Sequence, residues 1–369
     1  GTVVNGMEVL NSSDQKTEKL GHLSVPLGKE RIEVARLHAG DIGVVAKLKH
    51  THTNDTLSAA GRALVLEGID FPEPDIAVAV RAASRSDEDK ISTGLHKLHE
   101  EDPVFTSQFD PETKQTIIRG LGEMHLDVQL ERLKRKFGVE VTTEQPLIHY
   151  RETIRKPAEA HGRHKKQSGG RGQFGDCWVR LKPLERDAGY EFIDSIKGGV
   201  IPNKFIPSVD KGVQEAARRG ILAGYPVVDF AAELYDGSFH TVDSSDIAFQ
   251  IAGSLAFQAA SASAAPVLLE PIMEVKVVTP DEYMGEIIGD LNQRRARILG
   301  MDAQGKKTTI RAHVPEAELY KYATSLRSIS HGRAMHHRAF HGYEEVPQQI
   351  AERVIEDAKR DGEEVPTPA

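Results

Sequence analysis

A glycine-rich segment, HKKQSGGRGQFGDCWVRLKPLE at residues 164–185, contains the residue types most suggestive of chemistry. Its G-x-G-x-x-G pattern, which begins at Gly170, resembles the loop that binds dinucleotide phosphates where a strand passes into a helix. Here the preceding residues are basic and polar, and Cys177, Val179 and Leu181 alternate with polar neighbours as in a half-buried strand. We therefore predict a long hairpin with a basic tip and reject a dinucleotide site.

Two further segments come close to nucleotide-binding loops but lack a required residue. GMDAQGKKT, from Gly300, has the G-x-x-x-x-G-K frame, but Lys307 stands where Ser or Thr must hold the metal. PNKFIP contains Asn203 and Lys204, without the aspartate two positions later that would read guanine. We expect that this chain is not itself an enzyme and that it holds no cofactor.

Histidines gather in HGRAMHHRAFHGY, residues 331–343. On a strand, His337 and His341 would share one face and His336 would lie on the other. The segment offers neither a cysteine nor a nearby carboxylate to complete the tetrahedral ligand set of zinc. We therefore predict exposed histidines and no metal site. With only Phe340 for base stacking, an RNA-recognition module is disfavoured as well.

Composition and charge restrict the class of protein. Hydrophobic content of 39% and charged content of 28% are typical of a globular chain, and no apolar run is long enough for a membrane span. The single cysteine excludes internal disulfides and fits a reducing cytoplasm, and the start GTVVNGMEVLN shows no signal peptide. The net charge is −8, yet residues 160–175 and 319–343 contain no acidic residue, as in a protein that touches phosphate at defined points. Charge alone favours the alternative that these segments are ordinary solvated faces.

Periodicity predicts a multidomain α+β fold. Helices are indicated by GEMHLDVQLERLKRKFG, which ends at Gly138, and by DIAFQIAGSLAFQAASASA, which ends before Pro266. Short strands, among them ALVLEGI, fill the first part of the chain. The predicted segments are a partial β-barrel (1–70), a ferredoxin-like split βαβ unit (71–149), an α+β domain with the hairpin tip (150–270), a second ferredoxin-like unit (271–346), and a C-terminal helix and tail (347–369).

Several long motifs resemble those of one family. RHKKQSGGRGQFGD, GGVIPNKFIPSVDKGVQEA, LYDGSFHTVDSSDIAFQIAGS and LEPIMEVKVVTPDEYMGEIIGDLNQRRARILGM are closely similar to bacterial translation elongation factor G, or to a close paralogue of it. RGLGEMHLDVQLERLKRKF resembles the third domain of the same family. The resemblance covers essentially the whole chain, from the later half of domain II through domains III, IV and V. It implies that the GTPase domain, with its GTP and Mg²⁺, lies outside this sequence.

The resemblance implies a role in moving transfer RNA and messenger RNA through the ribosome, coupled to GTP hydrolysis. Domain IV would be the arm that enters the decoding region, and His240 matches the family histidine that faces the codon and anticodon. The intact factor would be a ribosome-stimulated GTPase. The implied decoding-region tip consists of Lys165, Lys166, Ser168, Gly169, Gly170, Arg171, Gly172, Gln173, His240 and Asp243.

Domain V would contact large-subunit RNA near the GTPase-activating centre, through Arg294, Arg295 and Arg297. We expect a cytoplasmic monomer whose partners are the ribosome, transfer RNA and messenger RNA, with no membrane contact. One departure is that histidine and alanine replace the bulky apolar residues usual after Arg333. A paralogue that acts in ribosome recycling or protection, without efficient translocation, is therefore the alternative.

Overall fold

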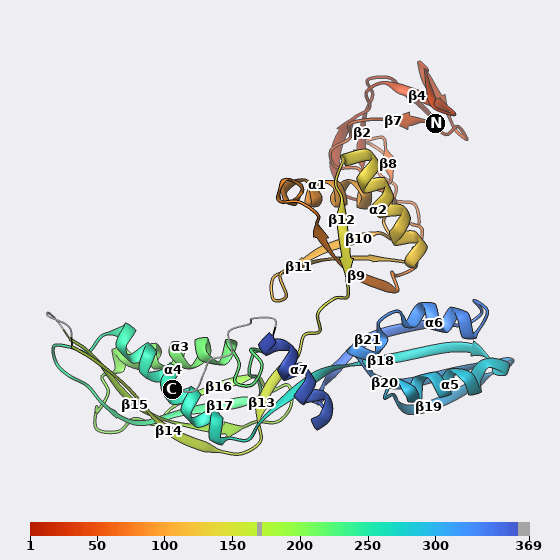
Figure 1. Ribbon diagram of the computed structural model, residues 1–369. Helices are drawn as coiled ribbons and strands as arrows, with labels where there is room; N and C mark the ends of the chain where they lie inside the picture. The colour runs from red at the N-terminus through yellow and green to blue at the C-terminus, as the bar shows by residue number, and fades with distance from the viewer. Residues whose placement is uncertain (168–171, 361–369) are drawn as a thin grey trace. The chain divides into compact units, whose positions relative to one another are not determined.

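The computed structural model describes residues 1–167 and 172–360, which form two compact units, Gly1–Pro146 and Leu147–Ala369 (Figure 1). Both units are α+β, and their sheets are antiparallel except for one parallel pair, β16 with β17. No helix in the described part of the chain is long and apolar enough to cross a membrane. The predicted multidomain α+β class is confirmed.

Residues 1–58 form three small antiparallel sheets, ordered β1-β6, β3-β2-β8 and β5-β4-β7, which do not close into a barrel within the described residues. Their strands are β1 (Thr2–Val4), β2 (Glu8–Asn11), β3 (Lys16–Lys19), β4 (Leu23–Leu27), β5 (Glu30–Glu33), β6 (Arg36–His38), β7 (Val44–Val45) and β8 (Leu57–Ser58).

The segment ALVLEGI, predicted as a strand, does not form one. No described strand runs beside it to supply the backbone hydrogen bonds that stabilise a strand. Its Leu64 and Leu66 side chains are therefore not covered, and the two residues are 60% and 63% exposed. The apolar run in the sequence could not show that no described strand pairs with this segment.

The rest of the first unit is a ferredoxin-like fold. Its sheet order is β10-β11-β9-β12, and α1 and α2 contribute Leu95, Leu98, Leu126 and Leu133 to its core. Helix α2 ends as predicted at Gly138, whose left-handed φ of 64° lets its N–H bond to the Lys134 carbonyl. The elements are β9 (Ile76–Ala82), α1 (Arg85–Glu101), β10 (Thr106–Asp110), β11 (Gln115–Gly120), α2 (Glu123–Phe137) and β12 (Val141–Glu144).

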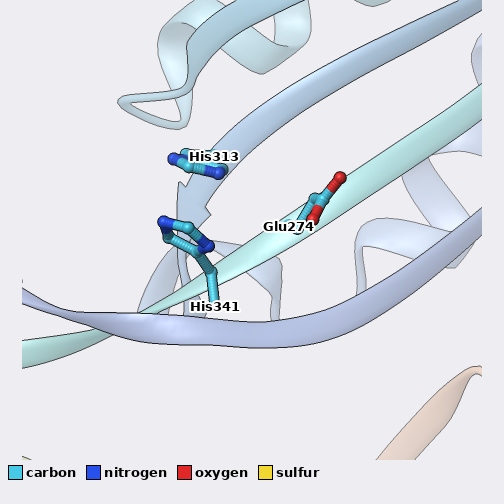
Figure 2. A group of neighbouring side chains, drawn as sticks. All are labelled: Glu274, His313 and His341. Atoms are coloured by element: carbon cyan, nitrogen blue, oxygen red, sulfur yellow. The ribbon is translucent and has the colours of Figure 1, made fainter. Parts of the chain in front are cut away.

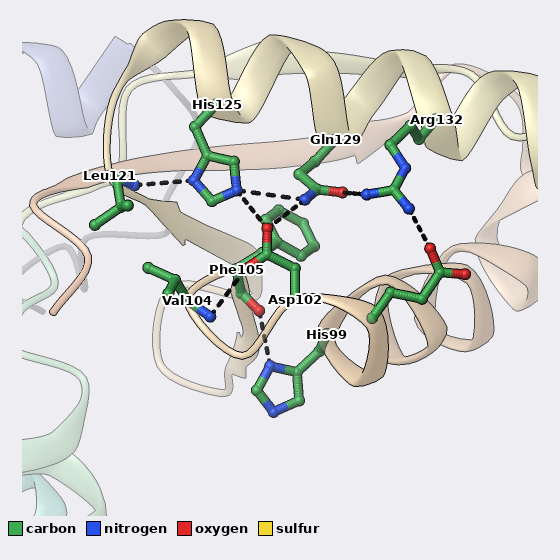
Figure 3. Close-up of polar contacts among 9 residues, drawn as sticks. His99, Asp102, Val104, Phe105, Leu121, His125, Gln129 and Arg132 are labelled. Atoms are coloured by element: carbon green, nitrogen blue, oxygen red, sulfur yellow. Dashed lines mark hydrogen bonds and ion pairs between the residues drawn. The ribbon is translucent and has the colours of Figure 1, made fainter. Parts of the chain in front are cut away.

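A polar network joins the two helices of this fold (Figure 3). The Asp102 carboxylate, just after α1, accepts hydrogen bonds from His125 Nε2 at 2.8 Å and Gln129 Nε2 at 2.7 Å, both on α2. The Leu121 N–H donates to His125 Nδ1 at 3.1 Å, so the ring carries its donor on Nε2. This network fixes the end of α1 against α2.

The second unit begins with the arm sheet, ordered β14-β15-β17-β16, one face of which is covered by α3 and α4. Its elements, with the preceding strand β13, are β13 (Arg151–Ile154), β14 (Ala158–Lys166), β15 (Gln173–Pro183), β16 (Tyr190–Asp194), η1 (Asn203–Phe205), α3 (Ile206–Arg218), β17 (Phe230–Ser238) and α4 (Asp246–Ser263).

Glycines let α4 lie directly on the hairpin of the arm sheet. A Cβ added at Gly162 on β14 would lie 2.0 Å from the Ala252 carbonyl oxygen, and one at Gly175 on β15 would lie 2.3 Å from the Ala248 oxygen. Both obstacles are backbone atoms of α4, which no side-chain rotation can move. The small residues of this helix, such as Ala248 and Ala252, are therefore matched by glycines on the sheet.

The C-terminal sheet, ordered β13-β18-β20-β19 with β21 also paired to β18, is the second ferredoxin-like fold, extended by β13. Strand β18 runs without interruption from Pro266 to Pro280, across the predicted domain boundary at residue 270. The elements are β18 (Pro266–Pro280), η2 (Asp281–Tyr283), α5 (Met284–Gln293), β19 (Arg297–Gln304), β20 (Lys307–Pro315), η3 (Glu316–Leu319), α6 (Tyr322–Ile329), β21 (Met335–Glu345) and α7 (Gln348–Arg360).

A buried carboxylate connects the arm to this second sheet. Glu152, on β13, has no exposed surface, and its two oxygens accept backbone N–H groups from Ile221, Leu222, Ala223 and Tyr225. Burial raises the pKa of Glu152, while the four hydrogen bonds act in the opposite direction. The turn that follows α3 is thus folded around one side chain.

We predict that Gly162→Ala destabilises the second unit. The new Cβ would meet the Ala252 carbonyl, and such overpacking costs about 1–3 kcal/mol. Urea unfolding followed by circular dichroism measures the loss. The matched control is Gly289→Ala on α5, where a Cβ has open space and replacing a helical glycine gains about 0.5–1 kcal/mol. Equal stability of Gly162→Ala and the wild type would contradict the packing.

We also predict that Asp102 titrates below its usual range. Burial acts to raise its pKa, but hydrogen bonds from His125, Val104 N–H and Gln129 outweigh it, and the net pKa is lowered. The ionised carboxylate therefore stabilises the fold above its unfolded pKa of about 3.9, and this contribution disappears as the pH falls through the folded value. NMR titration of the carboxyl group should give a low midpoint that rises in His125→Ala and stays in His96→Ala, an exposed site on α1.

Candidate nucleic-acid interface

The hairpin of β14 and β15 carries the predicted basic tip. Lys165 pairs with Phe174 and Lys166 with Gln173, and both lysines are exposed. The Gln173 Oε1 lies 2.9 Å from His164 Nε2 across the hairpin. The predicted tip residues Ser168, Gly169, Gly170 and Arg171 lie outside the described residues.

The His240 turn, between β17 and α4, is held by its own polar groups. The His240 N–H donates to Ser244 Oγ at 2.9 Å, and the Ser244 N–H donates to the His240 carbonyl at 3.2 Å. Ser245 caps α4, since its Oγ accepts from the Ala248 N–H at 3.3 Å. The turn therefore leads into a properly capped helix.

Asp243 joins this turn to the end of the hairpin. Its Oδ1 accepts from the Gly172 N–H at 3.1 Å, and its carbonyl accepts from the Phe174 N–H at 2.9 Å. A Cβ at Gly172 would lie 2.9 Å from Asp243 Cγ, so glycine permits the close approach. We call Gly172, Phe174, His240, Asp243 and Ser244 the tip clamp. The sequence motifs included Asp243 among the tip residues but did not reveal its hydrogen bonds, because its partners lie about seventy residues earlier in the chain.

The tip clamp also fixes the proton of His240. The Val242 and Asp243 N–H groups point at Nδ1 from 3.3 and 3.1 Å, so Nδ1 is an acceptor and the neutral ring carries its hydrogen on Nε2. The Asp243 carboxylate lies 3.4 Å from the same Nδ1, so it would form an ion pair only with a ring protonated there. The His240 side chain is 54% exposed, which makes Nε2–H a donor suited to a phosphate or a base edge.

A third cation near the tip is held against the hairpin. The Arg163 guanidinium carbon lies 5.8 Å from the centre of the Phe174 ring, and its Nε lies 3.6 Å from the Asp176 carboxylate. The tip therefore combines two exposed lysines, one restrained arginine and an oriented histidine. Such groups can neutralise phosphates and donate hydrogen bonds at fixed positions.

Three protein-family models match the chain one after another. The model described as Elongation Factor G, domain III matches residues 71–145, Elongation factor G, domain IV matches residues 146–265, and Elongation factor G C-terminus matches residues 267–354. The chain belongs to the elongation factor G family. It is a translation elongation factor-like protein, as the sequence motifs predicted. The three matched models describe domains III and IV and the C-terminus, none of which is the GTPase domain.

A solved structure supports the same assignment. The crystal structure of a protein from Thermus thermophilus is 40% identical in sequence and covers 98% of this chain with a TM-score of 0.86. This elongation factor G-family chain spans 54% of that protein's length. The likeness therefore extends over the tip-bearing domain and both ferredoxin-like folds.

The predicted large-subunit contact of this elongation factor G-family chain consists of three arginines with different surroundings. Arg294 bonds to the Asp290 carboxylate at 2.9 Å and to the Glu318 carbonyl. Arg295 forms a bidentate pair with Glu270 at 2.7 and 2.8 Å, and hydrogen bonding to Glu270 raises its pKa. Both arginines thus hold the C-terminal sheet together. An RNA contact by the group stays a prediction, for which Arg297, at 62% side-chain exposure, is the best placed.

We predict that Asp243→Ala loosens the tip clamp at one defined amide. Hydrogen bonds to charged groups contribute about 1.5–3 kcal/mol, so exchange of the Gly172 amide hydrogen should become about tenfold faster or more. The Phe174 amide, which bonds to the Asp243 backbone, is an internal control and should stay protected. Asp243→Asn keeps an acceptor oxygen and should show a smaller change. Unchanged exchange at Gly172 in Asp243→Ala would refute the clamp.

Proposed function

We propose that this chain is the ribosome-engaging part of an elongation factor G-like GTPase that promotes GTP-dependent movement of transfer RNA and messenger RNA. The observation that carries the proposal is the tip clamp. It presents His240 with a defined donor at the far end of a long hairpin, whose first strand ends in Lys165 and Lys166. A translocating arm needs such a fixed donor, because a mobile side chain would lose entropy on every contact with RNA.

The construction of the arm supports a mechanical role. The close packing of α4 on the hairpin at Gly162 and Gly175 stiffens the base of the tip. Glu152 fastens the opposite end of the arm to β13 and hence to the C-terminal sheet. A tip that transmits displacement must be rigid along its length, and this arrangement supplies that rigidity.

The proposal assigns nucleotide chemistry to another part of the protein. The chain spans 54% of its Thermus relative, and we propose that a GTPase domain, with GTP and Mg²⁺, completes the factor. The partners are the decoding region of the small subunit, the GTPase-activating centre of the large subunit, transfer RNA and messenger RNA. The factor acts as a cytoplasmic monomer.

The alternative function is ribosome recycling or protection. It is favoured by strand β21, where Met335 and Phe340 are 74% and 57% exposed and histidines occupy positions between them. A surface of this composition would meet a partner differently from a strand of bulky apolar residues. Translocation remains the primary proposal because the tip clamp is intact.

The deciding experiment uses the full-length factor with ribosomes that carry a messenger RNA and two transfer RNAs. After addition of GTP, primer-extension toeprinting should show a three-nucleotide shift of the messenger. His240→Ala should slow the shift about tenfold, because it removes a hydrogen bond worth about 1.5 kcal/mol to a charged partner. His22→Ala, whose side chain is 83% exposed in the first unit, is the matched control and should leave the rate unchanged.

Two outcomes would count against the proposal. GTP hydrolysis on ribosomes without a shift, in the wild type, would identify the recycling or protective paralogue. A normal shift in His240→Ala would show that the factor translocates without the histidine donor, and the role given to the tip clamp would then be wrong.

A further inference from the structure

Three ligand-type side chains meet on one face of the C-terminal sheet, from three different strands. Glu274 on β18 lies directly opposite His313 on β20 in the antiparallel register. On the other side of β18, the register with β21 shifts between Ile272 and Met273, and His341 is the extra residue of this bulge. Figure 2 shows the two rings facing each other with the carboxylate beside them. Their ligand atoms all lie within 4.8 Å of one another.

We propose that Glu274, His313 and His341 bind a zinc ion. Two imidazoles and one carboxylate are a ligand set that zinc accepts, with the fourth position left to water. Zinc bonds of about 2.0–2.2 Å at the tetrahedral angle place ligand atoms about 3.4 Å from each other, so binding draws the side chains together by side-chain rotation. His341 and Glu274 are exposed and have room for that rotation. The histidine segment considered alone lacked the carboxylate, which the neighbouring strand supplies.

Arg297 would compete with the zinc ion for His313. Its guanidinium lies 3.0 Å from His313 Nδ1 and 3.1 Å from the Glu344 carboxylate. An imidazole that binds zinc through Nε2 carries its hydrogen on Nδ1, and one that binds through Nδ1 has no lone pair left there. In either case the hydrogen bond from Arg297 to His313 is lost. Zinc binding therefore releases Arg297 from His313 and leaves it paired with Glu344.

The zinc ion would connect strands that the backbone already pairs. His313, Glu274 and His341 belong to three adjacent strands, so one ion would cross-link the middle of the C-terminal sheet. The expected result is a higher melting temperature of the second unit in the presence of zinc, since a ligand that binds only the folded state stabilises it.

Calorimetric titration of the 369-residue chain with Zn²⁺ tests the site. The wild type should bind one ion, and His341→Ala and Glu274→Gln should each weaken binding more than about tenfold, as even outer partners of a metal cost about 10–100-fold. His337→Ala removes an exposed histidine from the same strand and should change nothing. Arg297→Gln should bind more tightly, because the competing cation is gone. Cys177 is buried, and burial raises its pKa to about 12, so this thiol does not compete.

A second experiment distinguishes zinc bound at the proposed site from zinc bound non-specifically to other histidines. Replacement of Zn²⁺ by Co²⁺ should give the visible absorption of a tetrahedral ion, which His341→Ala should abolish while its circular dichroism stays that of the wild type. Absence of stoichiometric zinc binding in the wild type would overturn the proposal. So would equal affinity in His341→Ala and His337→Ala, which would place the ion elsewhere.

Discussion

One carboxylate without any exposed surface determines how the second unit is held together. Glu152 accepts four backbone N–H groups from the turn after α3, and removing any of those donors would leave a buried charge short of partners. Because Glu152 lies on β13, which pairs with β18, the same residue joins helix α3 to the strand that continues into the C-terminal sheet. Glu152 is therefore one of the contacts that join the arm to the C-terminal sheet, together with the ion pairs of Arg155 and Arg186 with Glu345.

At the tip, too, a carboxylate accepts a backbone N–H group, but it accepts fewer of them and lies nearer the surface. There, the Asp243 carboxylate accepts the Gly172 N–H at the surface, and its backbone completes the contact with Phe174. A charged oxygen that receives backbone donors can hold two distant segments without a large apolar core, which a narrow hairpin end has no room to build. Deep in the unit the Glu152 carboxylate holds the turn after α3, and at the tip the Asp243 carboxylate holds Gly172 against the His240 turn.

Patterns of neighbouring residues correctly predicted the helices, because helices are stabilised by interactions between adjacent turns. In α2, the helical spacing of Leu126 and Leu133 and the stop at Gly138 are properties of adjacent turns. The predicted helices α2 and α4 are both present in the structure. The strand predicted for ALVLEGI was wrong because a strand depends on a partner that lies elsewhere. The motifs indicated the tip segment and His240 as site residues, and this stays a prediction. They did not indicate the clamp through Asp243, because it depends on a contact between distant segments. In the C-terminal sheet, contacts between distant segments were likewise not visible in the sequence. Glu270 and Asp290 bind two of the three predicted arginines. Glu274, His313 and His341 meet only because of the antiparallel register and the bulge on β21.

Strand β18 has a mechanical consequence. It consists of 15 residues and, at about 3.3 Å per residue, extends for about 50 Å, with β13 bonded along its start and β20 and β21 along the remainder. A bonded strand resists bending far better than a loop, and β18 joins β13, β20 and β21 in one five-stranded sheet. Because β13 also carries Glu152, the C-terminal sheet is connected to the turn after α3 by hydrogen-bonded strands and not by a flexible linker.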